Sequence, residues 1–241
     1  MANSFLKAAK KVLKTEADAL EKLKDDLPID FSDLVEFILN LTGRVIVSGV
    51  GKSGHIGNKI AATLASTGTP AYFVHATEAS HGDLGMITEQ DLCLLISNSG
   101  ETVEMFDILT HARRFSIPIA TMSSNCESTL VKAANFQLCL PMADEACPIG
   151  MAPTTSTTMM LALGDALAVA LMEAKSFNAE NFKIFHPGGK LGAKLMTVSQ
   201  LMHKDDAIPL VKTELSMKET LLTMSTKGFG IAAIVDEIGS L

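Results

Sequence analysis

The sequence predicts an α/β fold in which a parallel sheet is covered by helices on both faces. Short apolar segments of strand length alternate with helical segments between residues 44 and 174. This alternation is typical of parallel strands joined by helical crossovers. The 241 residues are 47% hydrophobic and 20% charged, enough for one full α/β core and part of a second domain.

The N-terminal segment, residues 1–40, is expected to form helices that pack on this core. Leu6, Leu13 and Leu20 stand seven residues apart and place one apolar stripe on a helix. A second helix is expected over about residues 32–41, leading into the first strand. The stripe indicates packing in the core or between subunits.

Strands and helices then alternate along the chain. The expected strands are at residues 44–50, 71–75, 91–100, 117–124 and 136–141. The expected helices are at residues 53–67, 101–115, 127–134 and 154–174. The last helix is strongly apolar, so we expect it to be buried or shared between subunits. Ligands of open parallel sheets bind at the carboxyl ends of the strands, which directs attention to the loops there.

The composition excludes several classes of protein. The 20 basic and 27 acidic residues give a formal charge of −7, and no long basic cluster suits a nucleic acid. The four cysteines lack CxxC spacing, and those in apolar strands are expected to be reduced, which favours a cytoplasmic location. No segment approaches the roughly 20 apolar residues of a membrane span, and no signal peptide is expected.

The segment VIVSGVGKSGHIG, residues 45–57, is typical of loops that hold phosphate. It contains Gly-Lys-Ser, but a P-loop also needs a glycine where this sequence has Ile46, so a nucleotide hydrolase is excluded by spacing. Gly49, Gly51 and Gly54 have the spacing of a dinucleotide fingerprint, after a strand and before a helix. The glycines alone therefore indicate a phosphate without identifying its bearer.

A second candidate phosphate loop, ISNSGETVE, follows the third strand. Ser97, Asn98 and Ser99 leave the strand, Gly100 allows a tight turn, and Thr102 opens the next helix. Hydroxyl groups and the unpaired N–H groups of a helix start suit a phosphate. A serine-rich helix cap needs no ligand, but the neighbouring glycine loop favours phosphate binding.

Five motifs follow one another along the chain, namely GVGKSGHIGNKIAATLASTGTPAYFVHATEASHGDLGMI, ISNSGETVE, DEACPIGMAPTTSTT, GDALAVAL and FHPGGKLG. Together they resemble the sugar isomerase (SIS) domain of the arabinose-5-phosphate isomerases over about residues 40–195. The resemblance implies a five-stranded, Rossmann-like SIS domain at residues 41–195 that binds a phosphosugar rather than NAD. It also implies assembly as a homotetramer.

The reaction implied by the resemblance interconverts D-ribulose 5-phosphate and D-arabinose 5-phosphate through an enediol, at the head of Kdo and lipopolysaccharide synthesis. Moving the carbonyl between C1 and C2 requires a base, for which a carboxylate or an imidazole is suited. Polar donors must stabilise the enediolate, and a phosphate clamp must hold the sugar in register. No cofactor is required.

Four residues match catalytically relevant positions of the family: Lys52, Glu104, Glu145 and His186. Lys52 is expected to neutralise phosphate or enediolate charge, and either Glu104 or Glu145 to act as the base. His186 is suited to ring opening or proton shuttling, from a neighbouring subunit. The expected substrate contacts are Ser53, Gly68, Thr69, His75, His81, Ser97, Asn98, Ser99, Gly100 and Thr102.

Two pairs among these contacts need separate comment, one for possible zinc binding and one for its position in the sheet. His75 and His81 could hold zinc, yet a regular set of three or four ligands is lacking. The resemblance implies metal-independent catalysis, with zinc as an inhibitor bound most readily through His75. Gly68 and Thr69 precede a strand instead of following it, so we expect them to serve another subunit.

Residues 196–241 resemble the start of a CBS module, which usually occurs as a tandem pair in these isomerases. We expect this module to be incomplete.

A non-catalytic phosphosugar sensor would use the same pocket, beside a basic helix-turn-helix module that the N-terminal helices do not show. An NAD-dependent oxidoreductase would need Glu78 as its ribose acid, but Glu78 lies past the strand end. A housekeeping enzyme and a capsule or sugar-alcohol paralogue would share these motifs.

Overall fold

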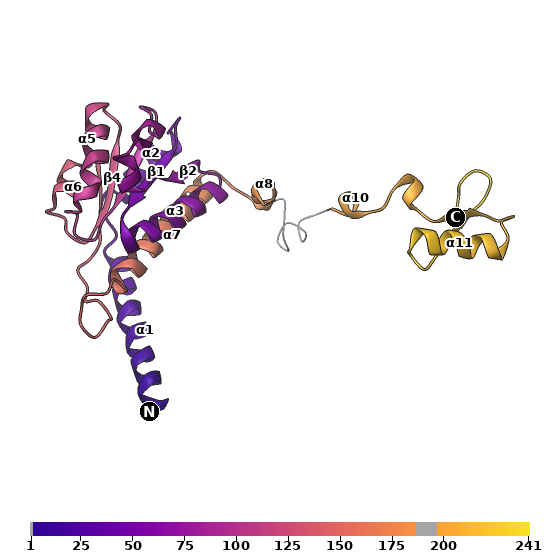
Figure 1. Ribbon diagram of the computed structural model, residues 1–241, viewed down its shortest axis with the longest axis horizontal. Helices are drawn as coiled ribbons and strands as arrows, with labels where there is room; N and C mark the ends of the chain where they lie inside the picture. The colour runs from indigo at the N-terminus through magenta and orange to yellow at the C-terminus, as the bar shows by residue number, and fades with distance from the viewer. Residues whose placement is uncertain (1, 187–196) are drawn as a thin grey trace. The chain divides into compact units, whose positions relative to one another are not determined.

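The computed structural model describes residues 2–186 and 197–241, which form two compact units (Figure 1). The first unit contains a five-stranded sheet and the second a two-stranded sheet. The expected domain boundary at residues 195 and 196 lies outside the described residues, as does the turn at 187–192 that follows His186.

The sheet of the first unit is parallel throughout, with the strand order β2-β1-β3-β4-β5. Its strands are β1 (Val45–Gly49), β2 (Ala71–Phe73), β3 (Leu92–Ile96), β4 (Ile119–Ser123) and β5 (Phe136–Cys139). Strands β1, β3 and β4 are buried at every residue, as expected for strands with helices over both faces. The predicted α/β fold with a five-stranded parallel sheet is confirmed.

Two apolar cores lie on the two faces of this sheet. Side chains alternate along each strand, so Val45 and Val47 join one core and Ile46 the other. The first core is covered by α1 (Ala2–Asp25), α2 (Phe31–Leu39), α3 (Gly51–Ser66) and α7 (Thr155–Ala174). The second is covered by α4 (Ala76–Ala79), η1 (Asp83–Met86), η2 (Val103–Met105), α5 (Phe106–Arg114) and α6 (Thr129–Ala133).

Helices α3 and α7 pack closely against each other over the first core. A Cβ atom at Gly164 of α7 would lie 2.4 Å from the Cδ1 atom of Ile60 in α3, so a larger residue would separate the helices. Lys59 and Asp165 form an ion pair beside this contact. The two helices therefore form one block.

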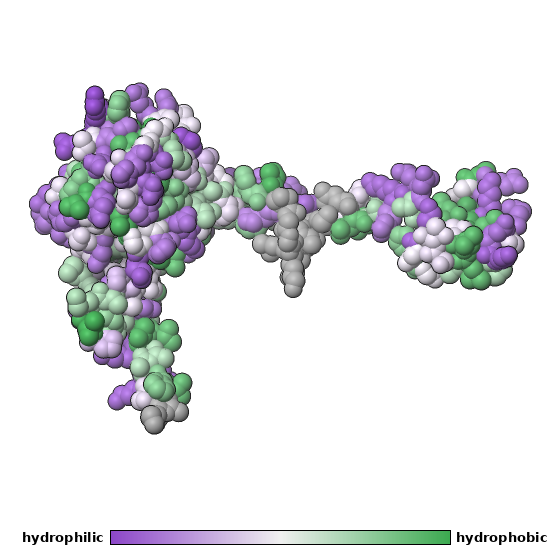
Figure 2. All heavy atoms as spheres, in the orientation of Figure 1, coloured by the Kyte–Doolittle hydropathy of each residue, from purple (hydrophilic) through white to green (hydrophobic). Residues whose placement is uncertain are grey.

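Only the second half of α1 packs on the core. Ala19 and Leu23 are buried, whereas Phe5, Leu6 and Leu13 are 71%, 62% and 66% exposed. The predicted apolar stripe exists, but its first half projects from the body of the unit and leaves hydrophobic residues on the surface (Figure 2).

One described helix, α7, is long and apolar enough to cross a membrane by length and composition. The expectation that no segment approaches this length is therefore wrong. Half of its apolar span is buried inside the unit, including Met159, Leu163 and Leu167 against the sheet. We interpret α7 as the core helix that the sequence predicted.

The second unit is a small β-α-β arrangement. Strands β6 (Leu210–Lys212) and β7 (Ala233–Val235) pair in parallel, with α11 (Met217–Lys227) between them in the chain. Helix α11 begins at a capping box of Ser216 and Glu219 and ends at Gly228 in the left-handed conformation. The helix α10 (Val198–Leu201) and the turn η3 (Asp205–Ala207) precede β6. The partial CBS module stays a prediction.

A buried ion pair joins the amino ends of β1 and β3. The Asp91 side chain is fully buried and accepts hydrogen bonds from Arg44 N (2.8 Å), Nε (3.1 Å) and Nη2 (3.0 Å). It also accepts from Thr88 N (2.8 Å) and Oγ1 (2.9 Å). Burial raises the pKa of this carboxyl, but the hydrogen bonds from Arg44 and Thr88 together lower it by more than burial raises it. The pKa of Asp91 is therefore below its ordinary value.

We expect Asp91→Asn to lower the free energy of unfolding by about 1–3 kcal/mol at neutral pH, because buried donors lose their charged acceptor. Since the folded pKa is depressed, the contribution of Asp91 is present above its unfolded pKa and is lost as the pH falls through its folded pKa. Urea unfolding from about pH 7 to about pH 3 measures both effects. The exposed neighbour Glu89→Gln is the control, and a gap between Asp91→Asn and wild type that does not narrow in acid would contradict the assignment.

Candidate functional site

The carboxyl ends of the five strands meet at one edge of the sheet. From β1 the chain turns to β2 on one side, whereas β3, β4 and β5 succeed one another on the other side. Ligands of open α/β sheets bind in the crevice at such a switch point. The loops that border it, residues 50–54 after β1 and 97–102 after β3, are the two predicted phosphate loops.

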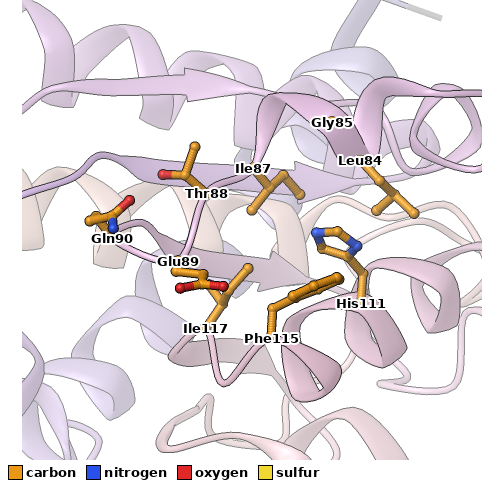
Figure 3. A pocket seen from close by; sticks show the side chains of 9 residues that line it. All are labelled: Leu84, Gly85, Ile87, Thr88, Glu89, Gln90, His111, Phe115 and Ile117. Atoms are coloured by element: carbon orange, nitrogen blue, oxygen red, sulfur yellow. The ribbon is translucent and has the colours of Figure 1, made fainter.

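A cavity of about 360 Å³ lies at the opposite edge (Figure 3). Thr88, Glu89 and Gln90, which precede β3, line it together with Phe115 and Ile117, which precede β4. The helices that cross back over the sheet end at this edge, and helix C-termini carry a partial negative charge. This cavity is therefore unfavourable for a phosphate.

The loop after β1 begins α3 with free N–H groups. The N-cap residue makes no side-chain hydrogen bond to the helix within the described residues, and Gly51 has a φ of +59° that favours glycine. A Cβ atom on Gly54 would lie 2.8 Å from the carbonyl oxygen of Gly49, so the helix start touches the strand end. Lys52 is exposed and Ser53 half-buried in this first turn, which is suited to an anion.

The loop after β3 is held by its own hydrogen bonds. Ser97 Oγ and Thr102 Oγ1 share a hydrogen bond of 2.8 Å, and Ser97 Oγ accepts another from Gly100 N at 3.0 Å. Ser97 is buried, so its hydroxyl organises the loop from inside. Gly100 has a φ of +65°, and a Cβ atom there would lie 1.9 Å from Ser128 Oγ. The shape of this loop requires glycine.

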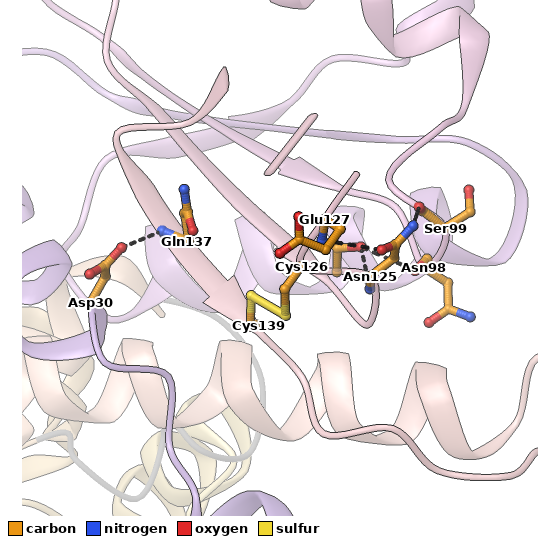
Figure 4. Close-up of a disulfide and its surroundings, with 9 residues drawn as sticks. Asp30, Asn98, Ser99, Asn125, Cys126, Glu127, Gln137 and Cys139 are labelled. Atoms are coloured by element: carbon orange, nitrogen blue, oxygen red, sulfur yellow. Dashed lines mark hydrogen bonds between the residues drawn. A yellow bond between two sulfur atoms is a disulfide. The ribbon is translucent and has the colours of Figure 1, made fainter. Parts of the chain in front are cut away.

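The exposed side of the same loop joins the loop after β4. Ser124 Oγ donates to Asn98 Oδ1 at 2.8 Å. Asn125 Nδ2 donates to the carbonyl oxygen of Ser99 at 3.2 Å (Figure 4). These four residues line a pocket of about 550 Å³ with Cys126 and Met142. The sequence analysis missed Ser124 and Asn125, although a polar run directly after a strand was a usable signal.

Cys126 and Cys139 form a disulfide between this loop and the end of β5, with Cα atoms 5.6 Å apart (Figure 4). The expectation of reduced cysteines is wrong for this pair, because β5 runs parallel to the adjacent β4 and ends at the same edge, which brings Cys139 to the loop after β4. Cys93 and Cys147 are free. Burial raises the pKa of the Cys93 thiol to about 12.

The predicted histidines flank α4, which follows β2 at this edge. His75 Nδ1 accepts a hydrogen bond from Thr77 N at 3.2 Å and so caps the helix, while His81 is exposed. No group of three or more His, Cys, Asp or Glu side chains that could hold a metal occurs within residues 2–186 and 197–241. The inhibitory zinc site at His75 stays a prediction.

Glu104 lies in the turn η2, against which α4 packs. Ser80 Oγ, at the end of α4, donates to Asp107 Oδ2 in α5 at 2.6 Å and links the two helices. The Glu104 side chain is exposed, and its carboxylate accepts no hydrogen bond from the part of the chain that the structure describes. Its lone pairs are therefore available to a ligand.

Glu145 follows β5 at the same edge, but its carboxylate is directed at the start of α7. Thr154 N (2.7 Å) and Thr154 Oγ1 (3.0 Å) donate to Oε2, and Ser156 Oγ donates to Oε1. Burial raises the pKa of Glu145, but these hydrogen bonds together lower it by more than burial raises it. The pKa of Glu145 is therefore below its ordinary value.

The remaining predicted residues lie at the other end of α7. Gly68 and Thr69 precede β2, where Lys175 Nζ donates to the carbonyl oxygen of Gly68 (3.0 Å) and to Thr69 Oγ1 (2.8 Å). Lys175 directly follows α7, so this contact lies at the amino edge of the sheet. The sequence analysis did not identify Lys175, and no local pattern marks it.

His186 ends α8 (Ala179–Phe185), beyond the C-terminus of α7 (Figure 1). Its ring stacks on Phe182 with centroids 3.7 Å apart, and Nδ1 lies 2.9 Å from the carbonyl oxygen of Phe182. The neighbouring Phe185 stacks on Phe177, whose ring lies against Gly68. Within one chain, His186 therefore lies with Gly68 and away from the phosphate loops.

Comparison with known proteins identifies the family of this chain. A model of the SIS domain matches residues 38–170. Arabinose 5-phosphate isomerase KdsD of Yersinia pestis is 51% identical over 234 residues, which are 97% of this chain and 71% of the relative. The chain belongs to the arabinose 5-phosphate isomerase family.

Two further comparisons support the assignment. KdsD of Pseudomonas aeruginosa is 48% identical over 238 residues, which are 98% of this chain and 73% of the relative. A protein of E. coli CFT073, solved in complex with arabinose 5-phosphate, is 38% identical and has a TM-score of 0.75 over 78% of this chain and 100% of its own. The predicted family of aldose–ketose isomerases with an SIS domain is confirmed.

We expect Gly100→Ala to lower the free energy of unfolding more than Gly150→Ala. Both glycines have a φ of +65°, which costs alanine about 1–2 kcal/mol. A Cβ atom at Gly100 also meets Ser128 Oγ, whereas no described atom lies within 4 Å of one at Gly150. Urea unfolding of the two variants measures the difference. Equal losses would mean that the contact with Ser128 does not restrain the loop.

Proposed function

We propose that this chain interconverts D-ribulose 5-phosphate and D-arabinose 5-phosphate. The observation that carries the proposal is the meeting of two phosphate loops where the strand order reverses. Two relatives about half identical in sequence are named arabinose 5-phosphate isomerase, and the E. coli CFT073 neighbour was solved with arabinose 5-phosphate bound. A pentose phosphate is the ligand that these observations favour.

The phosphate binds between the two loops. N–H groups at the start of α3 and the hydroxyl groups of Ser53, Ser99 and Thr102 donate to its oxygens, and Lys52 balances its charge. Ser97 and Gly100 keep the second loop in shape. The sugar then extends from the phosphate toward the other loops of this edge.

Isomerisation transfers a proton between C2 and C1 of the sugar. A base removes the C2 proton of the aldose, and the electron pair forms an enediolate with its charge on the C1 oxygen. A proton then moves from the C2 hydroxyl to the C1 oxygen, which shifts the charge to the C2 oxygen. Returning the first proton to C1 leaves the carbonyl at C2. Glu104 and Glu145 are the carboxylates proposed for this base, and Lys52, Asn98, His75 and His81 stabilise the oxygens.

Gly68, Thr69 and His186 enter the site from a neighbouring subunit. Within one chain they lie at the amino edge, away from the loops that hold the phosphate. The exposed apolar residues of α1 and the apolar groove of about 450 Å³ between α1 and α7 provide surface for an assembly. We propose a homotetramer, as the family resemblance implies.

The reaction belongs at the head of Kdo and lipopolysaccharide synthesis. We place it in the cytoplasm, where sugar phosphates are made. Thiols of the cytoplasm would then reduce the disulfide of Cys126 and Cys139. The proposed domains are N-terminal helices at 1–40, an SIS domain at 41–195 and a partial CBS module at 196–241.

The purified chain tests this function directly. Incubation with arabinose 5-phosphate should yield ribulose 5-phosphate, and the reverse reaction should proceed from ribulose 5-phosphate. Transfer of solvent deuterium to the sugar would report the proton-transfer step. Binding of the sugar phosphate without turnover would refute the isomerase and favour a sensor.

We expect replacement of the base to reduce turnover and replacement of a phosphate contact to weaken binding. If Glu104 moves the proton, Glu104→Gln should lower kcat by roughly 10²- to 10⁴-fold, because the amide keeps the shape but lacks the basic lone pair. Ser99→Ala should mainly raise KM, since its contact exists in the ground and transition states alike. Steady-state kinetics separate the two, and near-normal turnover of the Gln variants at positions 104 and 145 would refute a carboxylate base.

We expect sedimentation velocity to show an assembly of four 25.6 kDa chains. Leu13→Asp should dissociate it and lower activity, because a charge would be buried in the contact and His186 would leave the site. The control Lys11→Asp places the same charge on the opposite side of α1 and should leave the assembly intact. A stable monomer of the wild type would contradict the proposal.

A further inference from the structure

Glu145 is the most completely hydrogen-bonded carboxylate at the carboxyl edge of the sheet, among the residues that the structure describes. Its Oε2 accepts from Thr154 N, Thr154 Oγ1 and, at 3.4 Å, Ser156 N, and its Oε1 accepts from Ser156 Oγ. Both oxygens are therefore engaged by the chain itself. The second candidate base at this edge, Glu104, is exposed and accepts no hydrogen bond from the described residues.

The partners of Glu145 define its location at the N-terminus of α7. The first N–H groups of a helix have no partner within the helix, and their partial positive charge favours an anion. The N-cap residue Thr154 makes no side-chain capping bond to the described helix. Glu145, nine residues earlier in the chain, takes that place.

The same bonds close the loop that leads into α7. Thr154 Oγ1 donates to Glu145 and accepts from Ala146 N at 2.9 Å, so one hydroxyl joins both ends of the loop. Within the loop, Cys147 Sγ accepts from the N–H groups of Met151 and Ala152 at 3.1 Å each. The loop folds back on itself, with the carboxylate at its base.

The start of α7 is linked in turn to the phosphate loop. Met160 Sδ, in the second turn of α7, lies 4.0 Å from Ser53 Oγ in the first turn of α3. Further along, the contact of Gly164 with Ile60 holds the two helices in register. The first two turns of α7 are therefore in contact with the turn that contains Lys52 and Ser53.

We propose that Glu145 is a positioning residue for the isomerase reaction, which caps α7 and so holds the first turn of α3 in its phosphate-binding position, and that Glu104 is the proton-transferring base. This proposal rests on the proposed function. A general base needs a free lone pair directed at the substrate carbon, and of the two candidate glutamates only Glu104 has an unengaged carboxylate. The depressed pKa of Glu145 agrees with a permanently charged cap.

Kinetics of Gln variants at the two positions test the proposal. Glu145→Gln should raise KM for arabinose 5-phosphate about tenfold, the size of effect of losing a helix cap, and keep kcat within about threefold. The acid limb of its kcat–pH profile should match the wild type, because the base is unchanged. Glu104→Gln should lower kcat by roughly 10²-fold or more.

Ser156→Ala provides an independent measurement, because it removes a donor and leaves the Glu145 carboxylate in place. It should raise KM in the same direction, and the double variant should be less than additive with Glu145→Gln. The exposed neighbour Asp144→Asn is the matched control and should leave KM unchanged.

Two results would overturn the proposal. One is a fall of kcat by 10²-fold or more in Glu145→Gln with loss of the acid limb, which would make Glu145 the base. The other is a lower Tm with an unchanged KM, which would make its role purely structural. If the wild type binds arabinose 5-phosphate but does not convert it, the proposed function fails. The calorimetric Kd of Glu145→Gln for the same ligand would then still decide the positioning role.

Discussion

The close contact between α3 and α7 is the constraint on which the site depends. Because glycine stands at position 164, Ile60 packs directly on the backbone of α7, and the two helices are held in register over the sheet. Both helices start at the edge where the parallel strands end. The contact therefore sets the place of two helix N-termini at the edge where a sugar phosphate is proposed to bind.

The N-termini of α3 and α7 differ in whether a side chain of the protein occupies them. The start of α3 makes no side-chain cap within the described residues and carries Lys52 and Ser53, so it can accept an anion from outside. The start of α7 is occupied by the carboxylate of Glu145. With Glu145 at the start of α7, the start of α3 is the helix end left open to the proposed phosphate. Two glutamates at one edge of the sheet can thus serve different purposes, one for shape and one for chemistry.

The placement of residues at opposite edges of the sheet gives the proposed assembly a chemical role. A parallel sheet separates the strand ends by the length of its strands, so Gly68 cannot approach Ser99 within the same chain. Lys175 and Phe177, just beyond α7, support the amino edge where Gly68 and His186 lie. The amino edge of the sheet is thus held in a defined shape by these contacts. It can complete the proposed site of another subunit.

The sequence by itself determined the five strands and their main helices, because strand and helix periodicities are local properties of the chain, and its ordered motifs indicated the family. The phosphate role of the two loops stays a prediction. The tertiary structure decided what depends on residues far apart in the chain. It placed Cys126 beside Cys139, brought Asn125 to Ser99, and separated His186 from the loops. It also paired the carboxylate of Glu145 with a helix start nine residues later. Such pairings follow from strand order and helix packing, which no local spacing encodes, and for that reason sequence analysis left the choice between the two glutamates open.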